Sequence, residues 1–291
     1  MDEQRTALVT GATSGLGRAT AGLLAATPGW RVLLGARDPD AGRRVATELG
    51  PHTGVLPLDL ADLASVRAAA ASAAERGPLD ALLLVAGVQQ IRADRASADG
   101  HELTFAVNHL GHFLLTQELL PHLAPGARVV VVSSGTHFGT SRKSGPFPGP
   151  RWADPRELAR PRAESGQRAY ATSKLANVYF GRELAGRCPQ LSVVVYDPGL
   201  MPVTGLARSY PAPARALYSA LAPLLARLPF AQTPEQAAAQ LAALVTGPAG
   251  RSGRYVERDA EAPSSPESTD PDRARELWEV SAELVAPAPV R

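Results

Sequence analysis

The chain has 291 residues, and its 30 basic and 28 acidic side chains leave a formal net charge of +2 at pH 7. An apolar share of 45% and a charged share of 20% are typical of a globular protein and argue against a disordered chain or a coiled coil. The small net charge argues against a nucleic-acid-binding protein, and the sequence has no apolar run of about 18 residues, the length that a membrane span needs.

A single cysteine, Cys188, excludes an intramolecular disulfide and a cysteine-based metal cage. Residues 1–10 contain no apolar core of signal-peptide length, so we expect a cytoplasmic protein in a reducing compartment. Only two lysines, Lys143 and Lys174, accompany 28 arginines, which makes a lysine inside a motif informative.

Short apolar runs alternate with alanine-rich segments along the chain. In chain order, the runs predict strands at residues 6–10, 31–36, 53–58, 81–86, 128–133 and 192–196. The segments between them predict helices at residues 17–26, 39–49, 63–76, 102–123 and 169–186. The valine runs of the last two strands lack polar alternation, which is typical of strands buried on both faces. The pattern predicts one α/β domain over residues 1–291, with a doubly wound parallel sheet of the Rossmann type.

Three segments depart from this alternation. Residues 141–165 are rich in proline, glycine and arginine and predict a long surface insertion. Residues 203–230 are apolar but contain several prolines; we expect a substrate lid there, and the same composition also fits a homo-oligomer surface or a contact with a membrane surface. Residues 261–291 are interpreted as a C-terminal extension, in which a polar stretch precedes an amphipathic helix at 272–285.

A glycine-rich motif, Thr-Gly-Ala-Thr-Ser-Gly-Leu-Gly at residues 10–17, lies where the first strand turns into the first helix. Glycines at such a turn let the pyrophosphate of a dinucleotide approach the backbone, and the helix N-terminus offers it unpaired N–H groups. The motif therefore predicts a dinucleotide site, with a structural tight turn as the alternative. Its residues are Gly11, Thr13, Ser14, Gly15, Leu16 and Gly17.

Together with four further residues in the same chain order, this motif resembles the short-chain dehydrogenase/reductase family. The four are Asn108 in Asn-His-Leu-Gly-His-Phe, Ser134 after the fifth strand, and Tyr170 and Lys174 in Tyr-Ala-Thr-Ser-Lys. Residues 108–116, 173–177 and 277–279 look like the branch that holds retinol dehydrogenases and light-dependent protochlorophyllide reductases. The resemblance covers nearly the whole chain and implies a Rossmann fold and an NAD(P)-dependent oxidoreductase.

Tyr170 and Lys174 are four residues apart, so they share one face of the predicted helix. Hydride transfer to a carbonyl develops charge on its oxygen, which a proton donor must neutralise. A neighbouring ammonium and an oxidised nicotinamide lower the pKa of a phenol from its ordinary value of about 10. The resemblance implies that Tyr170 is the acid/base, that Lys174 lowers its pKa and binds the ribose, that Ser134 holds the substrate oxygen, and that Asn108 keeps a relay water in place.

The second strand ends at Arg37 and Asp38, where this fold reads the adenosine ribose. An acidic residue there favours the 2′-hydroxyl of NAD, whereas an arginine accepts the 2′-phosphate of NADP; we expect NADP(H) rather than NAD(H), with Arg18 assisting. The resemblance adds Asp59 and Leu60 near the adenine, Ala86 and Gly87 after the fourth strand, and Pro198, Gly199 and Thr204 near the nicotinamide. Val85 stands where the family has an asparagine, which affects local packing rather than chemistry.

Histidines offer two further candidates. His109 and His112 have the spacing of a metal pair, but the sequence places no third ligand at a useful distance, so we expect helix packing and no metal site. His137 follows Ser134 closely; bordering a substrate pocket and a hydrogen bond within the loop are equally good interpretations.

The predicted function is interconversion of a carbonyl and an alcohol with NADP(H), on an apolar or medium-sized substrate. Two alternatives remain open: reduction of a carbon–carbon double bond or another tailoring reaction on the same fold, and an NADP(H)-binding sensor without turnover.

Overall fold

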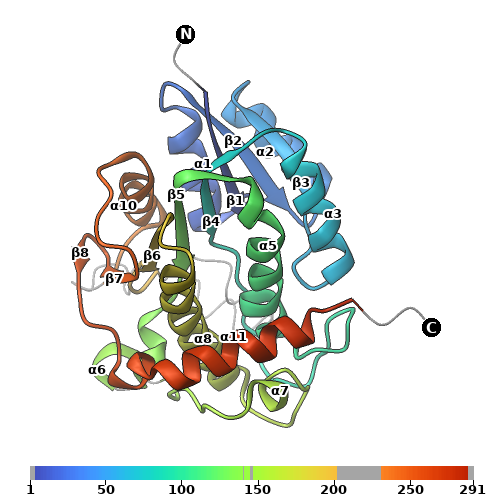
Figure 1. Cartoon of the computed structure of the whole chain (residues 1–291), viewed down its shortest axis with the longest axis vertical. Coiled ribbons are helices and arrows are strands. Elements are labelled where there is room, and N and C mark those ends of the chain that lie inside the picture. The colour runs from blue at the N-terminus through green and yellow to red at the C-terminus, as the bar shows by residue number, and fades with distance from the viewer. Residues whose placement is uncertain (1–3, 140, 145–146, 202–230, 288–291) are drawn as a thin grey trace, which may run out of the picture.

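A single sheet runs through the molecule (Figure 1). The computed structural model describes residues 4–139, 141–144, 147–201 and 231–287. In these residues the strand order is β3-β2-β1-β4-β5-β6-β7-β8, and neighbouring strands are parallel except for β7 and β8. The strands are β1 (Arg5–Thr10), β2 (Trp30–Ala36), β3 (Thr53–Pro57), β4 (Leu79–Leu84), β5 (Leu123–Val132), β6 (Ser192–Asp197), β7 (Arg254–Glu257) and β8 (Ala260–Glu261).

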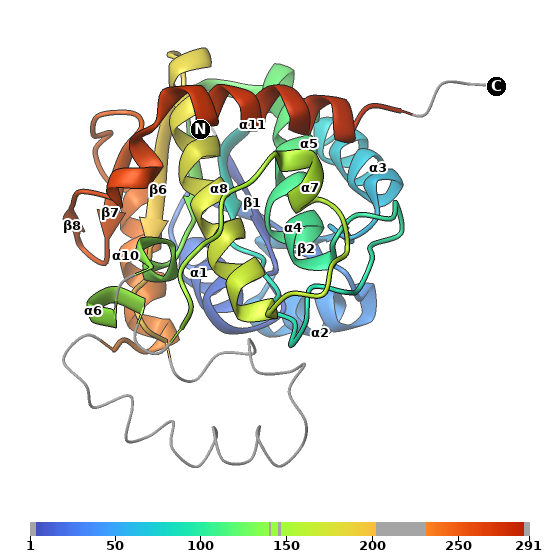
Figure 2. The ribbon, with the colours of Figure 1, turned by 90° about the horizontal axis from the view of Figure 1, so that it is seen from below.

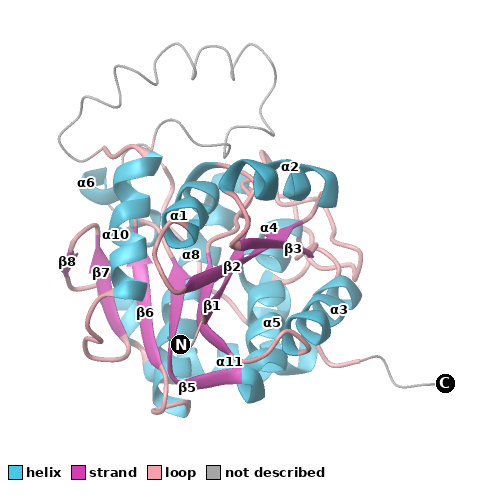
Figure 3. Cartoon of the chain, turned by 90° about the horizontal axis from the view of Figure 1, so that it is seen from above, coloured by secondary structure: helices cyan, strands magenta, loops and turns pink. Residues whose placement is uncertain are grey.

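Helices cover both faces of this sheet (Figure 3). The helices are α1 (Gly15–Ala25), α2 (Pro39–Leu49), α3 (Leu63–Ala74), α4 (Leu103–Phe105), α5 (Gly111–Leu119), α6 (Ser141–Ser144), α7 (Pro155–Leu158), α8 (Gly166–Arg187), α10 (Pro234–Thr246) and α11 (Pro271–Leu284). Helices α1, α2 and α10 pack with Val130 on one face, and α3, α5 and α8 pack with Val131 on the other. Consecutive valines of β5 are thus buried on opposite faces, and the predicted α/β fold is confirmed.

All six predicted strands are present, but β7 and β8 were missed. In β7 only Tyr255 and Val256 are apolar, between Arg254 and Glu257. That run is too short to stand out in the sequence, and its pairing with β6, where Val194 is the partner of Arg254, defines it as a strand.

The helix predicted over residues 102–123 is present as a continuous helical segment at residues 103–122, but it is not α-helical throughout. Helix α4 is followed by a π-helical turn at Ala106–Leu110, then by α5 and a 3₁₀ turn at Leu120–His122, and Leu123 already belongs to β5. Pro121, which has no N–H to donate, lies in the 3₁₀ turn where the helix ends. The π-helical turn carries Asn108, so the departure from α-helical geometry falls on a candidate catalytic residue.

The predicted insertion at 141–165 lies only partly on the surface. Leu158 and Ala159 are buried in the core that lies between α5 and α8, and the chain around them is fastened by a 2.7 Å hydrogen bond from Arg162 N to Ala93 O. The predicted C-terminal helix is present as α11, which crosses α8 and α5 (Figure 2). Its Trp278 ring packs against Phe113 and Phe180, with ring centroids 5.1 and 6.0 Å away.

The proposed substrate lid at 203–230, together with Thr204, lies outside the described residues. Within the described ranges, no helix has the length and apolar character that crossing a membrane requires.

Candidate active site

The glycine loop between β1 and α1 has a shape that only glycines allow. Gly11 and Gly15 have positive φ angles of 66° and 53°, a conformation that other residues rarely adopt. A Cβ on Gly17 would lie 2.4 Å from the carbonyl oxygen of Gly11, so α1 begins directly against the loop. This open backbone at a helix N-terminus, with Thr13, Ser14 and Leu16 completing the turn, fits the pyrophosphate of a dinucleotide.

Thr10 joins this loop to the end of β4. Its Oγ1 accepts hydrogen bonds from the backbone N–H groups of Val85 and Ala86, at 2.9 and 3.0 Å. His112 Nδ1 faces the carbonyl oxygen of Asn108 at 3.2 Å and therefore carries the proton, so Nε2 accepts from the Thr10 hydroxyl at 2.9 Å. The turn in which Val85 replaces the family's asparagine is thus held by Thr10 and His112.

At the carboxyl end of β2, where the sequence predicts the adenosine ribose, Arg37 is exposed. Asp38 is engaged elsewhere: it caps α2, and its Oδ1 accepts from the N–H groups of Asp40 and Ala41 at 2.9 and 3.2 Å. Arg18 forms a surface ion pair with Glu48 of α2. Asp38 is thus occupied in capping α2, whereas Arg37, directly at the end of the strand, has no capping role.

Asp59 and Leu60 follow β3, and Leu60 lies against the start of α5. Asp59 Oδ1 accepts from Ala61 N at 3.0 Å, which fixes the turn. A Cβ on Gly111 would lie 2.5 Å from Leu60 O, so only glycine lets α5 approach this closely.

Tyr170 and Lys174 are buried on α8, facing the end of β5. Lys174 Nζ donates to Val132 O at 3.0 Å, and the side chain of Ser134 lies close enough to the Tyr170 hydroxyl to lower its pKa. Ser134 is half-buried and begins the loop that follows β5. The structure thus brings together the three residues that the sequence motif proposed.

The protein by itself does not lower the pKa of Tyr170. Burial raises it, the neighbouring Asp197 carboxylate raises it further, and the hydrogen bond with Ser134 lowers it. Burial also lowers the pKa of Lys174 to about 8, against the opposite influence of Asp197. The sequence-based expectation of a lowered phenol pKa included the positive charge of an oxidised nicotinamide, and without that charge burial dominates.

Asn108 uses its side chain to hold the backbone beside Lys174. Its Nδ2 donates to Val88 O at 3.0 Å and to Ser173 Oγ at 2.9 Å, and its Oδ1 accepts from Val88 N at 2.8 Å. A Cβ on Gly87 would lie 3.4 Å from Asn108 Oδ1 and 3.7 Å from Lys174 Nζ. Gly87 therefore leaves the space in front of both groups open.

His137 is buried behind Ser134 and uses both ring nitrogens. Its Nδ1–H donates to Ser134 O at 2.7 Å, and its Nε2 accepts from Ser265 N at 3.2 Å. Burial lowers its pKa to about 4, so the ring is neutral near pH 7. These contacts match the loop-bonding interpretation of His137.

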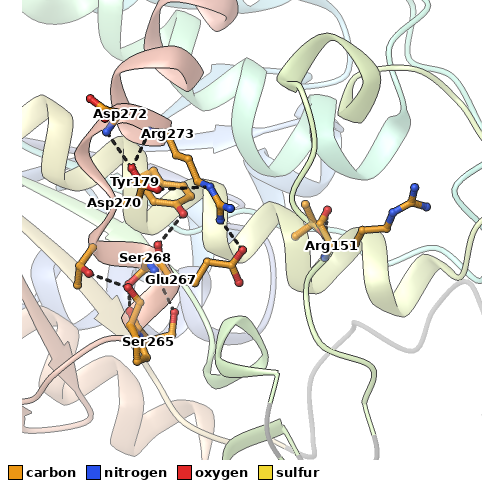
Figure 4. A network of polar contacts seen from close by, with 11 residues as sticks. Arg151, Tyr179, Ser265, Glu267, Ser268, Asp270, Asp272 and Arg273 are labelled. Atoms are coloured by element: carbon orange, nitrogen blue, oxygen red, sulfur yellow. Dashed lines mark hydrogen bonds and ion pairs between the residues drawn. The ribbon is translucent and has the colours of Figure 1, made fainter.

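Through Ser265, the loop of Ser134 is joined to the C-terminal segment, which a polar network fastens to α8 (Figure 4). Tyr179 Oη donates to Glu267 O at 2.7 Å, and Arg273 Nη1 donates to Glu267 Oε1 at the same distance. The polar stretch after residue 261 is thus partly buried and packs against α8, the helix that carries Tyr170.

Sequence reasoning missed Asp197 and Tyr255. Asp197 ends β6 directly before Pro198 and Gly199, and its Oδ1 accepts from Gly199 N at 2.9 Å. Its Oδ2 accepts from the hydroxyl of Tyr255 on β7 at 2.8 Å. An acidic residue that ends an otherwise apolar strand was a visible signal, whereas Tyr255 could be found only through the missed strand.

The histidine pair on the central helix serves packing. His109 lies among Phe105, Phe113 and Phe180, and its Nε2 is 2.8 Å from Ser281 Oγ. Burial lowers the pKa of both His109 and His112 to about 3. In the part of the chain that the structure describes, no group of three histidine, cysteine or acidic side chains is arranged to hold a metal.

A parallel sheet with a glycine-rich turn after β1 and a buried tyrosine–lysine pair beside it defines a dinucleotide-dependent oxidoreductase. A family model described as short chain dehydrogenase matches residues 5–145. "Dehydrogenase/reductase SDR family member 13" of Bos taurus is 39% identical over 301 residues, which cover 98% of this chain and 74% of that protein. The chain belongs to the short-chain dehydrogenase/reductase family and is an NAD(P)-dependent oxidoreductase.

Two further relatives confirm the branch that the sequence resemblance indicated. Retinol dehydrogenase 14 of Homo sapiens is 37% identical, with 97% of this chain and 86% of that protein covered. Protochlorophyllide reductase B of Oryza sativa subsp. japonica is 34% identical, with 96% and 77% covered. Among solved structures, an uncharacterized protein from Mycobacterium paratuberculosis superposes with a TM-score of 0.74 at 30% identity, covering 97% of this chain and 94% of that one. The similarity to a retinol dehydrogenase supports an enzyme that acts on carbonyl and alcohol groups.

Proposed function

We propose that this protein interconverts a carbonyl and an alcohol with NADP(H), on an apolar or medium-sized substrate, and that Tyr170 is its acid/base. The observation that carries the proposal is the place of the Lys174 ammonium nitrogen, anchored on Val132 O and 5.5 Å from the ring centre of the buried Tyr170, on whose hydroxyl Ser134 acts. A proton donor, a hydrogen-bond donor for the substrate oxygen and a fixed cation are the groups that carbonyl reduction needs.

When bound, a nicotinamide supplies or accepts the hydride. The chain's own residues do the rest. Tyr170 gives its proton to the substrate oxygen, and Ser134 holds that oxygen by a hydrogen bond. Lys174 keeps a positive charge beside the phenol, anchored on Val132 O. Asn108 fixes Val88 and Ser173, and thereby the backbone on either side of Lys174. The relay water proposed for Asn108 would have to bind an acceptor atom that the hydrogen bonds with Val88 and Ser173 do not occupy.

The residues that would hold the cofactor are those around the glycine loop and the strand ends. Gly11, Gly15, Gly17 and Gly87 leave backbone open, and Pro198 and Gly199 would close over the nicotinamide. The preference for NADP(H) rests on exposed Arg37 and on Asp38, whose carboxylate caps α2 instead of being offered to a ribose hydroxyl.

The test is loss of the reduced-nicotinamide absorbance with NADPH or NADH and a panel of aldehydes, ketones and quinones. We expect carbonyl-dependent loss of NADPH, faster than that of NADH, with the alcohol as product. If neither NADPH nor NADH binds in a fluorescence titration, the proposal is overturned.

A second candidate is reduction of a carbon–carbon double bond, which the similarity to protochlorophyllide reductase B favours. Product analysis with an enone distinguishes the two reactions, because carbonyl reduction gives an unsaturated alcohol and double-bond reduction gives a saturated ketone. The Ser134–Tyr170–Lys174 arrangement argues against a sensor without turnover, since binding alone does not need it.

A further inference from the structure

Asp197 places a buried carboxylate directly behind the proposed catalytic residues. It is 1% exposed and ends β6. The residue before it, Tyr196, is the register partner of Val132, whose carbonyl oxygen accepts the hydrogen bond of Lys174 Nζ. From the adjacent loop, a Cβ on Gly135 would lie 3.4 Å from Asp197 Oδ2. The carboxylate therefore borders both the Ser134 loop and the anchor of Lys174.

Two donors fix the orientation of this carboxylate. Gly199 N donates to one oxygen and the Tyr255 hydroxyl to the other. Tyr255 is itself buried, with its ring against His137 and Phe138, so it cannot swing away. Burial raises the pKa of Asp197, and the two donors act in the opposite direction, toward the ionised carboxylate.

We propose that Asp197 is a positioning residue that sets the charge balance of the active site: its carboxylate favours the protonated form of Tyr170, which can donate a proton, and the ammonium form of Lys174. This inference rests on the proposed function of Tyr170 and Lys174. A negative charge near a phenol opposes loss of its proton, and near an amine it opposes loss of the charge.

The other charged groups around Asp197 do not cancel the effect of its carboxylate on Tyr170 and Lys174. Asp197 raises the pKa of both Tyr170 and Lys174. The charged and titratable groups that act on it or face it are Tyr170 and Lys174 of α8, Tyr196 of β6, Tyr255 and Glu257 of β7, and Lys143 of α6. Lys143 is paired with Glu257, Nζ to Oε1 at 2.6 Å, so its charge is largely balanced outside the site.

The test is the pH dependence of kcat for alcohol oxidation, which needs the deprotonated Tyr170. In Asp197→Asn the apparent pKa of this profile should fall by about one unit or more, a tenfold change in the protonation equilibrium. Glu261→Gln is the control, because it removes a carboxylate of β8 that is paired with Arg251 at the surface. Its profile should stay in place. If Asp197→Asn lowers kcat but leaves the apparent pKa of the profile unchanged, Asp197 has only a structural role and the inference is overturned.

A direct titration of Tyr170 separates this inference from the proposed function. With NADP⁺ bound, the ultraviolet difference spectrum of the phenolate, referenced to Tyr170→Phe, gives the phenol pKa without any turnover. A shift between wild type and Asp197→Asn supports the inference even if no substrate is found, and an unchanged value contradicts it even in an active enzyme.

Should Asp197→Asn fail to fold, Tyr255→Phe provides the second variant. It leaves the carboxylate in place but removes one donor, so Asp197 loses charge more readily and the profile should shift in the same direction by less. An unmoved profile in Tyr255→Phe would then count against the inference.

Discussion

The ammonium nitrogen of Lys174 lies 5.5 Å from the centre of the Tyr170 ring, one helical turn further along α8. The same nitrogen donates to Val132 O at the end of β5. Helix and sheet together therefore hold the cation at a fixed place beside the phenol. A spacing of four residues alone would leave a lysine free to point into solvent, and the anchor on β5 prevents this.

Replacing Gly17 by alanine should abolish cofactor binding. The added Cβ would meet Gly11 O at 2.4 Å, so the glycine loop or α1 must move, and overpacking of this kind costs about 1–3 kcal/mol. The measurements are NADPH fluorescence titration and thermal unfolding. Gly22→Ala in the same helix is the control, because its Cβ would meet only the flexible tip of Leu49 at 3.1 Å. Normal NADPH binding by Gly17→Ala would mean that the loop is not the pyrophosphate site.

Replacing Arg37 by serine should remove the preference for NADP(H). Charge-assisted hydrogen bonds to a 2′-phosphate contribute about 1.5–3 kcal/mol, so KM for NADPH should rise about 10- to 100-fold. KM for NADH should change little, since NADH lacks that phosphate. Arg43→Ser tests for a general effect of charge, because Arg43 is also exposed and pairs with Asp40 on α2. Equal changes for both cofactors in Arg37→Ser would show that Arg37 does not read the ribose.

The protein should lose stability as the pH falls below about 6.5. His109 and His112 are neutral in the fold, with pKa values of about 3, whereas in the unfolded chain they take up protons near 6.5. The stability from each is complete above the unfolded value and is lost between about 6.5 and 3, at about 1.4 kcal/mol per pH unit. Asp197 and Glu102 act in the opposite direction, because burial raises their pKa values.

His109→Phe isolates one of these contributions. Its new ring would lie among Phe105, Phe113 and Phe180, and Ser281 would lose its partner, so stability at pH 7 should change by only about 1 kcal/mol. The loss of unfolding free energy between pH 7 and pH 5, measured in urea, should become smaller by about 2 kcal/mol, because the unfolded histidine takes up its proton only below about pH 6.5. A slope equal to that of the wild type would show that His109 is charged in the fold or is not buried there.

Local patterns predicted much of this molecule. The valine runs at 128–133 and 192–196 indicated a parallel sheet buried on both faces, and β5 and β6 are buried in this way. The glycine motif and the spacing of Tyr170 and Lys174 depend on neighbouring residues alone, so the sequence was sufficient to find them.

The remainder depends on contacts between distant segments. Strand β7 has two apolar residues and exists through its pairing with β6. The π-helical turn at Asn108 lies where the side chain reaches Val88 and Ser173, 20 and 65 residues away in the chain. His137 is held by Ser265, 128 residues later. No window of the sequence contains both partners of such a contact, and the site behind Ser134 was therefore not foreseen.

The most direct test of the account is turnover by Tyr170→Phe, measured as loss of NADPH absorbance with the best carbonyl substrate. The substitution removes the hydroxyl on which Ser134 acts and keeps the ring beside Lys174. We predict unchanged NADPH binding and a kcat lower by about 100-fold or more, since general acid catalysis typically contributes about 10²–10⁴. Full activity in Tyr170→Phe would contradict the assignment of Tyr170 as the acid/base.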